Sequence, residues 1–339
     1  MSVDRYPWLN DAINAYKNIN FPSSTIIEGE SGLAKQHLAK YFAQKLLCSD
    51  ELGPCGNCNS CNYFVAGSHP DFAYLSSEDR SSNLVPITKN IYSRLAKTIS
   101  NDQINSKTIP GMRGLNAFID LSHSVSLNRV CIIFNAEDMN ISAQNSLLKT
   151  LEELPDNKYI MLVSNKRNCF LPTIYSRSKK LSINIPSNID IDNWISSQGY
   201  IDYTTLNFAP DSTPLEIERL INNDMAGQYM EISQNLNSYC LGNTSTPDLI
   251  KFYKDTNISF DEKINSIILF LKTCIGINQD FYKSHPSITS MENMKLDAVA
   301  VSDLIEELVD YKYQLNKVPA LNEQIGLNNF FYKIKNLFS

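Results

Sequence analysis

The alternation of apolar and polar residues between positions 129 and 155 predicts a buried strand followed by an amphipathic helix. Val130 to Phe134 is short, rich in β-branched residues and nearly free of polar side chains, as expected for a strand covered on both faces of a parallel sheet. Asn140 is a suitable N-cap for the helix. Four leucines then recur at helical spacing and predict a stripe that packs against the sheet: Leu147, Leu148, Leu151 and Leu154.

Two further stretches contain a predicted buried strand. Residues 23–47 are predicted to form a strand, a glycine-containing loop and a helix, and residues 159–163 a further buried strand. Strands that alternate with helices in this way predict an α/β domain built on a parallel sheet. Apolar residues with helical period mark the helix at the end of the first stretch: Leu38, Ala39, Phe42, Ala43, Leu46 and Leu47.

The segment NSLLKTLEELP, from Asn145 to Pro155, resembles the signature of the bacterial clamp-loader ATPases of the AAA+ class. In that family the signature follows a strand that carries the acidic Walker B residues. Aligned on the helix, the two acids fall on Phe134 and Asn135, and neither side chain can act as a carboxylate. Glu137 and Asp138 lie just beyond, after the turn, and are not expected to replace them.

The resemblance implies an AAA+ (RecA-like) domain over residues 1–165, a small helical lid domain over 166–208 and an all-α collar domain over 209–339. Residues 76–107 are polar and are expected to form a surface loop with a short helix. The helical patterns from residue 215 onward, without a strand signature, agree with a helical bundle at the end of the chain.

The loop between residues 29 and 36 has lost parts of a phosphate-binding loop. A working loop reads Gly, four residues, Gly, Lys, then Ser or Thr, so that backbone N–H groups and the lysine hold phosphates and the hydroxyl binds Mg²⁺. Gly29, Gly32 and Lys35 are present, but Ala34 replaces the second motif glycine and Gln36 replaces the hydroxyl residue. We therefore expect a degenerate site that uses no ATP. The alternative is a glycine loop that was never a nucleotide site.

Four cysteines with the spacing C-x6-C-x2-C-x2-C predict a zinc module over residues 48–61. Cys48, Cys55, Cys58 and Cys61 supply the four thiolates of a tetrahedral structural Zn²⁺ site, with no position left for a substrate. A redox Cys-x-x-Cys motif is the alternative, but it leaves two cysteines without a role. His69 is expected to be a turn residue and not a ligand.

The segment TIYSRSKKL resembles the Ser-Arg-Cys motif of clamp-loader subunits, with Ser176 and Arg177 retained and Ser178 in place of the cysteine. In that family the arginine points into the ATP site of the neighbouring subunit, so the resemblance implies that Arg177 is an arginine finger acting in trans. The alternative is a basic surface patch, since four further cations lie nearby: Lys166, Arg167, Lys179 and Lys180.

Composition narrows the possible partners. The chain of 339 residues has a net charge of -6, which argues against a protein that wraps nucleic acid by bulk electrostatics. It has no apolar run long enough to span a bilayer, and its start, MSVDRYPWLN, lacks the features of a secretory signal, so a cytoplasmic location is expected.

The resemblance as a whole implies a non-hydrolysing subunit of the DNA polymerase III clamp loader. Such a subunit would sit in a five-membered ring with the gamma or tau and delta subunits, and through the complex it would help load the sliding clamp onto primed DNA. Two alternatives stay open at this point: an ATP-hydrolysing subunit of the gamma or tau type, and a zinc-dependent nucleic-acid-binding protein unconnected with any ring.

Overall fold

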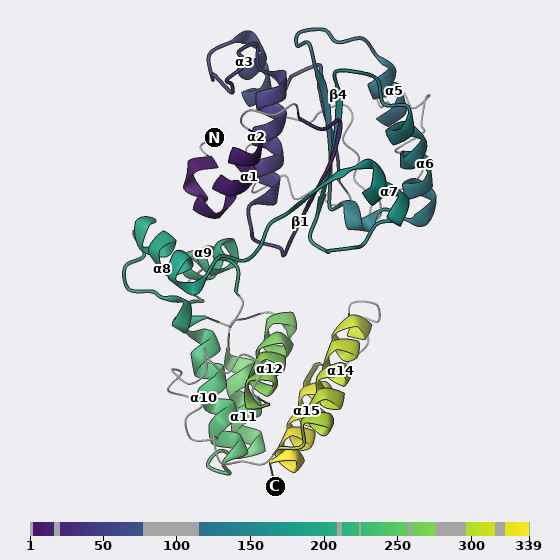
Figure 1. Cartoon of the computed structure of the whole chain (residues 1–339). Coiled ribbons are helices and arrows are strands. Elements are labelled where there is room, and N and C mark those ends of the chain that lie inside the picture. Colours follow the sequence, from purple (N-terminus) through teal and green to yellow (C-terminus); the bar gives the residue numbers. More distant parts are fainter. Residues whose placement is uncertain are drawn as a thin grey trace. The chain divides into compact units, whose positions relative to one another are not determined.

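The computed structural model describes residues 3–16, 21–76, 115–208, 212–223, 225–256, 258, 260–275, 296–315 and 323–338. The chain divides into two compact units, residues 1–186 and 187–339 (Figure 1). Each unit has its own cluster of buried apolar residues. The polar stretch predicted over residues 76–107 lies almost entirely outside the described residues.

A five-stranded parallel sheet forms the centre of the N-terminal unit, with the order β2-β3-β4-β1-β5. The strands predicted at 130–134 and 159–163 are confirmed, because β3 and β4 pair in parallel and place Val130 opposite Tyr159. All residues of β1 and β3 are buried, as the nearly continuous apolar runs predicted. The strand bounds are β1 Ser24–Glu28, β2 Phe72–Ser76, β3 Arg129–Phe134, β4 Lys158–Ser164 and β5 Lys179–Ser182.

Helices cover both faces of this sheet (Figure 1). One face carries α1 (Asn10–Ala15), α2 (Lys35–Leu47) and α3 (Asn59–Val65), and the other carries α5 (Leu115–Asp120), α6 (Ile141–Glu152) and α7 (Pro172–Arg177). The predicted cap of α6 is confirmed, since Asn140 Oδ1 accepts a hydrogen bond of 2.8 Å from the backbone N–H of Ala143. The short 3₁₀ helices are η1 Val3–Arg5, η2 Pro7–Leu9 and η3 Ala136–Asp138.

The leucine stripe of α6 packs against the sheet as predicted. Leu147 and Leu151 are buried in the core on this face, and Leu148 and Leu154 are partly buried against it. Ile174 of α7 belongs to the same cluster, so α6 and α7 are fixed to each other through the core.

Residues 166–186 belong to the sheet in the structure, because β5 pairs with β1 and α7 leads into β5. The unit boundary therefore falls at 186/187 and differs from the one drawn after residue 165 from the sequence. The reason is that β5 has the sequence KKLS, with no buried residue to mark it as a strand. The lid predicted over 166–208 thus begins inside the N-terminal unit, and its division from a collar over 209–339 stays a prediction.

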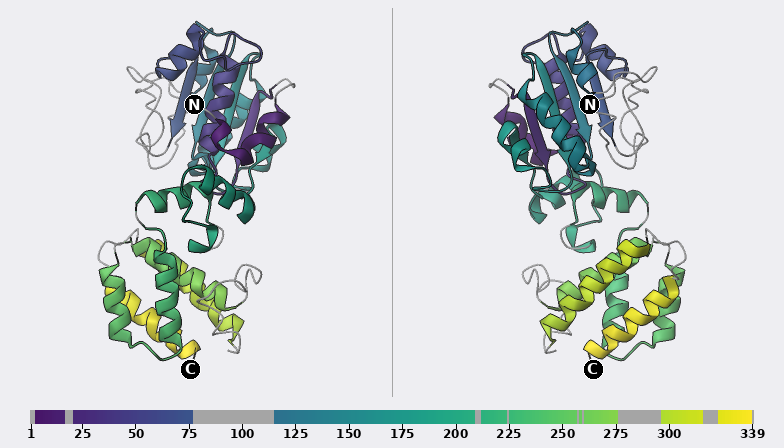
Figure 2. Two further views of the ribbon diagram at one scale, coloured as in Figure 1. Left: turned by 90° about the vertical axis from the view of Figure 1, so that its left-hand side faces the viewer. Right: turned by 90° about the vertical axis from the view of Figure 1, so that its right-hand side faces the viewer.

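Among its described residues, the C-terminal unit contains only helices (Figure 2). The helical pattern predicted from residue 215 onward is interrupted before residue 228, where Gly227 adopts a left-handed φ of 84° and caps a new helix. No helix in the described part of the chain is long and apolar enough to cross a membrane. The helices are α8 Asn188–Ser197, η4 Thr205–Asn207, α9 Pro214–Asn222, α10 Gln228–Cys240, α11 Thr246–Asp255, α12 Phe260–Cys274, α14 Ala298–Leu315 and α15 Glu323–Leu337.

Candidate functional site

The degenerate phosphate loop lies at the carboxyl end of β1, where it leads into α2. In open parallel sheets, ligands bind beyond the carboxyl ends of the strands. Gly29 is required by a close approach, because a Cβ at this position would lie 2.4 Å from the carbonyl oxygen of Ile183. Ala34 has a left-handed conformation with φ of 59° and ψ of 21°, which costs a residue with a Cβ about 1–2 kcal/mol. Ala34 therefore holds a backbone conformation that glycine adopts more readily.

The lysine of the loop is occupied by groups of its own chain. The Lys35 ammonium donates hydrogen bonds to the carbonyl oxygen of Glu30 and, at 3.0 Å, to Oδ1 of Asn165, which follows β4. The Lys35 side chain is only 3% exposed. Burial lowers its pKa to about 8, and the negative charges of Glu137 and Glu30 act in the opposite direction. Lys35 is thus satisfied inside the protein without a phosphate.

The positions expected to carry the missing acids lie at the carboxyl end of β3. Phe134 is buried, with its ring centroid 6.0 Å from that of Tyr74 and 5.9 Å from the Lys40 ammonium nitrogen. Asn135 is left-handed, with φ of 49°, and its Oδ1 lies 3.5 Å from Nδ2 of Asn165. An aromatic ring and an amide therefore lie at the carboxyl end of β3, and neither can act as a carboxylate.

Glu137 is a member of this cluster that the sequence did not place. Its Oε1 accepts a hydrogen bond of 3.1 Å from the backbone N–H of Asn165. Its Oε2 is buried and has no hydrogen-bond partner among the described residues. Its negative charge raises the pKa of Lys35 and so opposes the effect of burial. The two residues are 102 positions apart in the chain, so no local pattern could predict this influence.

The four predicted zinc ligands come together. Their sulfur atoms all lie within 4.8 Å of one another, and Sγ of Cys48 is 3.9 Å from Sγ of Cys58. Four sulfurs bound to Zn²⁺ at about 2.3 Å in a tetrahedron lie about 3.8 Å apart, so the cluster has the size of a zinc site. Cys48, Cys55, Cys58 and Cys61 are free thiols, so no disulfide links them within the cluster.

Hydrogen bonds around the sulfurs also suit thiolates. Backbone N–H groups of Asp50 and Cys55 point at Sγ of Cys48, each at 3.4 Å. Hydrogen bonds from Ser49 are the largest influence on Cys58 and lower its pKa to about 5, whereas burial raises the pKa of Cys61 to about 12. Zinc ligands bind as thiolates, so binding of a metal to Cys61 would release its proton.

His69 lies beside the cysteine cluster but is not one of its ligands. Its Nδ1 accepts from the backbone N–H of Asp71 at 3.0 Å, and its Nε2 is 2.8 Å from Oγ of Ser60. Ser60 Oγ in turn donates to the carbonyl oxygen of Leu47. The imidazole thus connects α3 to the end of α2 and the start of β2, and burial lowers its pKa.

Arg177 is the last residue of α7, and its side chain is 36% exposed. One terminal nitrogen contacts Oε1 of Glu152 at 2.6 Å, and the other donates to the carbonyl oxygen of Thr173 at 3.3 Å. Of the neighbouring cations, Lys180 pairs with the buried Glu28 at 2.7 Å, and Arg167 donates to Asn184 at 2.8 Å.

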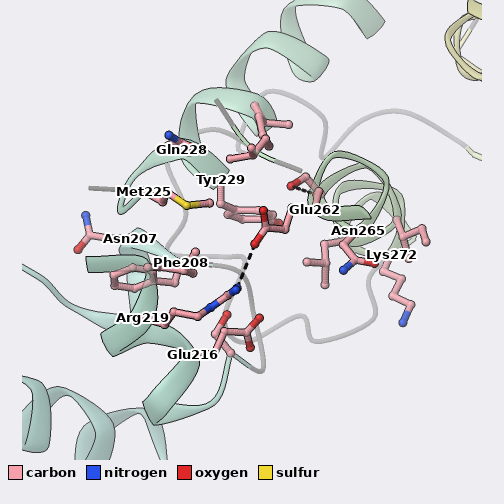
Figure 3. Close-up of a pocket in the computed structure, with 17 residues that line it drawn as sticks. Asn207, Phe208, Glu216, Arg219, Met225, Gln228, Tyr229, Glu262, Asn265 and Lys272 are labelled. Atoms are coloured by element: carbon pink, nitrogen blue, oxygen red, sulfur yellow. Dashed lines mark hydrogen bonds and ion pairs between the residues drawn. The ribbon is translucent and has the colours of Figure 1, made fainter. Parts of the chain in front are cut away.

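A separate pocket in the C-terminal unit has no marker in the sequence (Figure 3). It is a cavity of about 310 Å³ between α9, α10 and α12, with apolar walls that include Phe208, Tyr229 and Ile232. Arg219 and Glu262 form an ion pair of 3.0 Å at this pocket, so these two charges balance each other.

Comparisons with known proteins place the N-terminal unit in a family. The profile described as "DNA polymerase III, delta subunit" matches residues 8–187, which is more than half of the chain. The DNA polymerase III subunit delta' of Haemophilus influenzae is 29% identical over 202 residues, covering 58% of this chain and 54% of the relative. The chain thus spans about half the length of this relative.

Other matches cover nearly the whole chain at lower similarity. The DNA polymerase III subunit delta' of Buchnera aphidicola subsp. Schizaphis graminum is 22% identical over 95% of this chain and 94% of the relative. The match to a solved gamma subunit-related protein of Thermotoga maritima covers 97% of this chain and 99% of that protein, with a TM-score of 0.40 and 14% identity. By the profile match and these relatives, the chain belongs to the DNA polymerase III delta-subunit family and resembles its delta' (delta-prime) members.

Proposed function

We propose that this chain is a non-hydrolysing, delta-prime-type subunit of the DNA polymerase III clamp loader. Membership of the family supports a place in this complex. The proposed partners are the gamma or tau and delta subunits in a five-membered ring in the cytoplasm. Through the complex, the chain would help load the sliding clamp onto primed DNA during replication.

The observation that carries the non-hydrolysing role is the internal engagement of Lys35. A lysine that binds phosphates must present its ammonium to the ligand, but here Nζ is bonded to Glu30 and Asn165 and the side chain is 3% exposed. The hydroxyl that would bind Mg²⁺ is absent at Gln36, and Phe134 and Asn135 replace the acids. Phosphoryl transfer depends on positioning and on charge stabilisation by these groups, so their joint loss leaves no route to turnover.

The proposed active contribution is Arg177 in trans. An arginine supplied by a neighbouring chain stabilises charge in the transition state of phosphoryl transfer and is worth about 10³–10⁵ in rate. Arg177 is exposed at the end of a helix that is anchored in the core through Ile174, so its guanidinium is available to a neighbour. A subunit that hydrolyses nothing can therefore still accelerate hydrolysis next to it.

The cysteine cluster is proposed to hold Zn²⁺ in a structural role. Cys48, Cys55, Cys58 and Cys61 would be its ligands, and a bound ion would tie together the segment from 48 to 61. Gly53 supports this compact turn, because a Cβ there would lie 2.7 Å from Sγ of Cys48.

Reconstitution of the complex with and without this chain tests the proposal. Arg177→Ala is expected to leave the ring assembled and to slow ATP hydrolysis by the partner, whereas the matched control Lys179→Ala, an exposed cation two residues away, is expected to leave the rate unchanged. An ATPase rate unaffected by Arg177→Ala would remove the finger assignment.

The isolated chain provides the second test. A titration with Mg-ATP is expected to show no turnover. If the chain showed turnover that Lys35→Ala abolished, it would be a gamma- or tau-type ATPase and not a non-hydrolysing subunit. Failure to co-elute with ATPase subunits, together with tight DNA binding by the chain alone, would favour a zinc-dependent nucleic-acid-binding protein.

A further inference from the structure

The carboxyl ends of α6 and α7 are brought together by a rigid frame. Gln144 of α6 accepts a hydrogen bond of 3.0 Å from the backbone N–H of Leu171, the residue before α7. Leu151 and Ile174 are buried in the same core cluster. The two helices therefore meet at fixed places, and their last residues, Glu152 and Arg177, form an ion pair of 2.6 Å.

Glu152 stands where a carboxylate is electrostatically disfavoured. It is the last residue of α6, and the carboxyl end of a helix carries partial negative charge that favours cations. Glu153 follows directly and adds a second negative charge. The pair is also half exposed, at 36% and 49%, so it is worth little to the stability of the fold. A structural reason for a carboxylate at this position is therefore weak.

The pair instead defines the orientation of the guanidinium. An arginine has five N–H donors, and the contacts with Glu152 and Thr173 engage one on each terminal nitrogen. The remaining donors have no acceptor among the described residues of the chain and are available to a ligand. Arg177 can thus be held in one geometry and still contact the charge that develops on a phosphoryl group in the transition state.

We infer that Glu152 is a positioning residue for Arg177, holding its guanidinium ready for the nucleotide of the neighbouring subunit. This inference rests on the proposed trans role of Arg177. Donors that are already oriented need no reorganisation when charge develops in the transition state. A displacement of about 1 Å at a catalytic group can cost about 10²-fold in rate, so the fixed geometry matters more than the small stability of the pair.

The test is ATP turnover by the reconstituted complex with a graded series at Glu152. Glu152→Gln keeps an acceptor but loses the charge and is expected to lower kcat about threefold. Glu152→Ala removes the acceptor and is expected to lower kcat about fivefold, equivalent to about 1 kcal/mol, the upper end of what a half-exposed ion pair contributes. KM should stay unchanged in both, because Arg177 acts on the transition state and not on substrate binding. Glu153→Ala, an exposed neighbour, is the matched control.

A double variant separates positioning from a structural effect. In the Arg177→Ala background, Glu152→Ala should cause no further loss, since there is no guanidinium left to orient. Equal slowing in both backgrounds, or wild-type kcat in Glu152→Ala while Arg177→Ala is slow, would overturn the positioning role. A complex indifferent to Arg177→Ala would instead overturn the proposed function of the finger, on which this inference depends.

Discussion

Asp71 is expected to be among the most stabilising polar residues of the N-terminal unit. Its side chain is fully buried, and Oδ1 contacts the guanidinium of Arg129 at 2.8 Å. Its two oxygens also accept backbone N–H groups of Ser124, Val125 and Ser126 at 2.8, 2.8 and 3.0 Å. Burial alone would raise the pKa of Asp71, but these N–H groups and Arg129 outweigh it and keep the pKa below its ordinary value.

Asp71→Asn keeps the shape of the side chain but removes the charge and points an NH₂ group at donors. Breaking a buried ion pair on one side costs about 3–5 kcal/mol, because the partner charge remains buried. Arg129 is 2% exposed and also donates to the carbonyl oxygens of Phe118 and Ser122, so it cannot turn to solvent without losing these bonds. We therefore expect the N-terminal unit to lose about 3–5 kcal/mol of unfolding free energy at pH 7.

Urea unfolding followed by tryptophan fluorescence measures this loss. Trp8 reports on the N-terminal unit and Trp194 on the other, so the comparison is made in a Trp194→Phe background. Asp156→Asn, at an exposed position, is the control and should change stability by less than about 0.5 kcal/mol. A loss below about 1 kcal/mol for Asp71→Asn would refute the reasoning. Adding Arg129→Met should recover part of the loss, because no buried charge is then left unpaired.

The ion pair of Asp71 with Arg129 also makes the unfolding free energy depend on pH. A carboxyl whose folded pKa is depressed contributes stability that is present above its unfolded pKa of about 3.9 and is lost as pH falls through the folded value. The difference between wild type and Asp71→Asn should therefore be constant near neutral pH and shrink below about pH 4.

Two further predictions concern the cysteine cluster and a buried lysine. The purified chain should contain about one Zn²⁺ by metal analysis, and chelation should remove the ion and lower the thermal stability of the N-terminal unit. Cys61→Ser should abolish zinc binding, whereas Cys169→Ser should not. A metal-free chain of unchanged stability would contradict the zinc site. Lys40→Met should stabilise by about 1–3 kcal/mol at pH 7, because the Lys40 ammonium is buried without an acceptor among the described residues and burial lowers its pKa to about 8. Lys40 keeps its proton up to about pH 10.4 in the unfolded chain but loses it near pH 8 in the folded one. In urea titrations the stability of the wild type relative to Lys40→Met should therefore rise between about pH 8 and 10. A difference that does not change with pH would contradict this prediction.

The sequence by itself determined the features that depend on neighbours in the chain. The strand at Val130 to Phe134, the Asn140 cap and the leucine stripe follow from periodicity and capping chemistry, which act within a few residues. The cysteine cluster follows from its spacing, because ligands separated by two residues can reach one ion only through tight local turns. The losses at Ala34 and Gln36 are likewise visible as residue types alone.

Only the tertiary structure decided what these groups contact. Three contacts join residues that are far apart in the chain: Lys35 with Asn165, Asp71 with Arg129, and Glu152 with Arg177. The order of the strands and the packing of the helices determine these partners. The fifth strand, KKLS, was also missed, since its pairing with β1 is made by the backbone and leaves no apolar pattern. Sequence patterns predict which residues are buried. The partner of a buried charge depends on which element the fold places beside it.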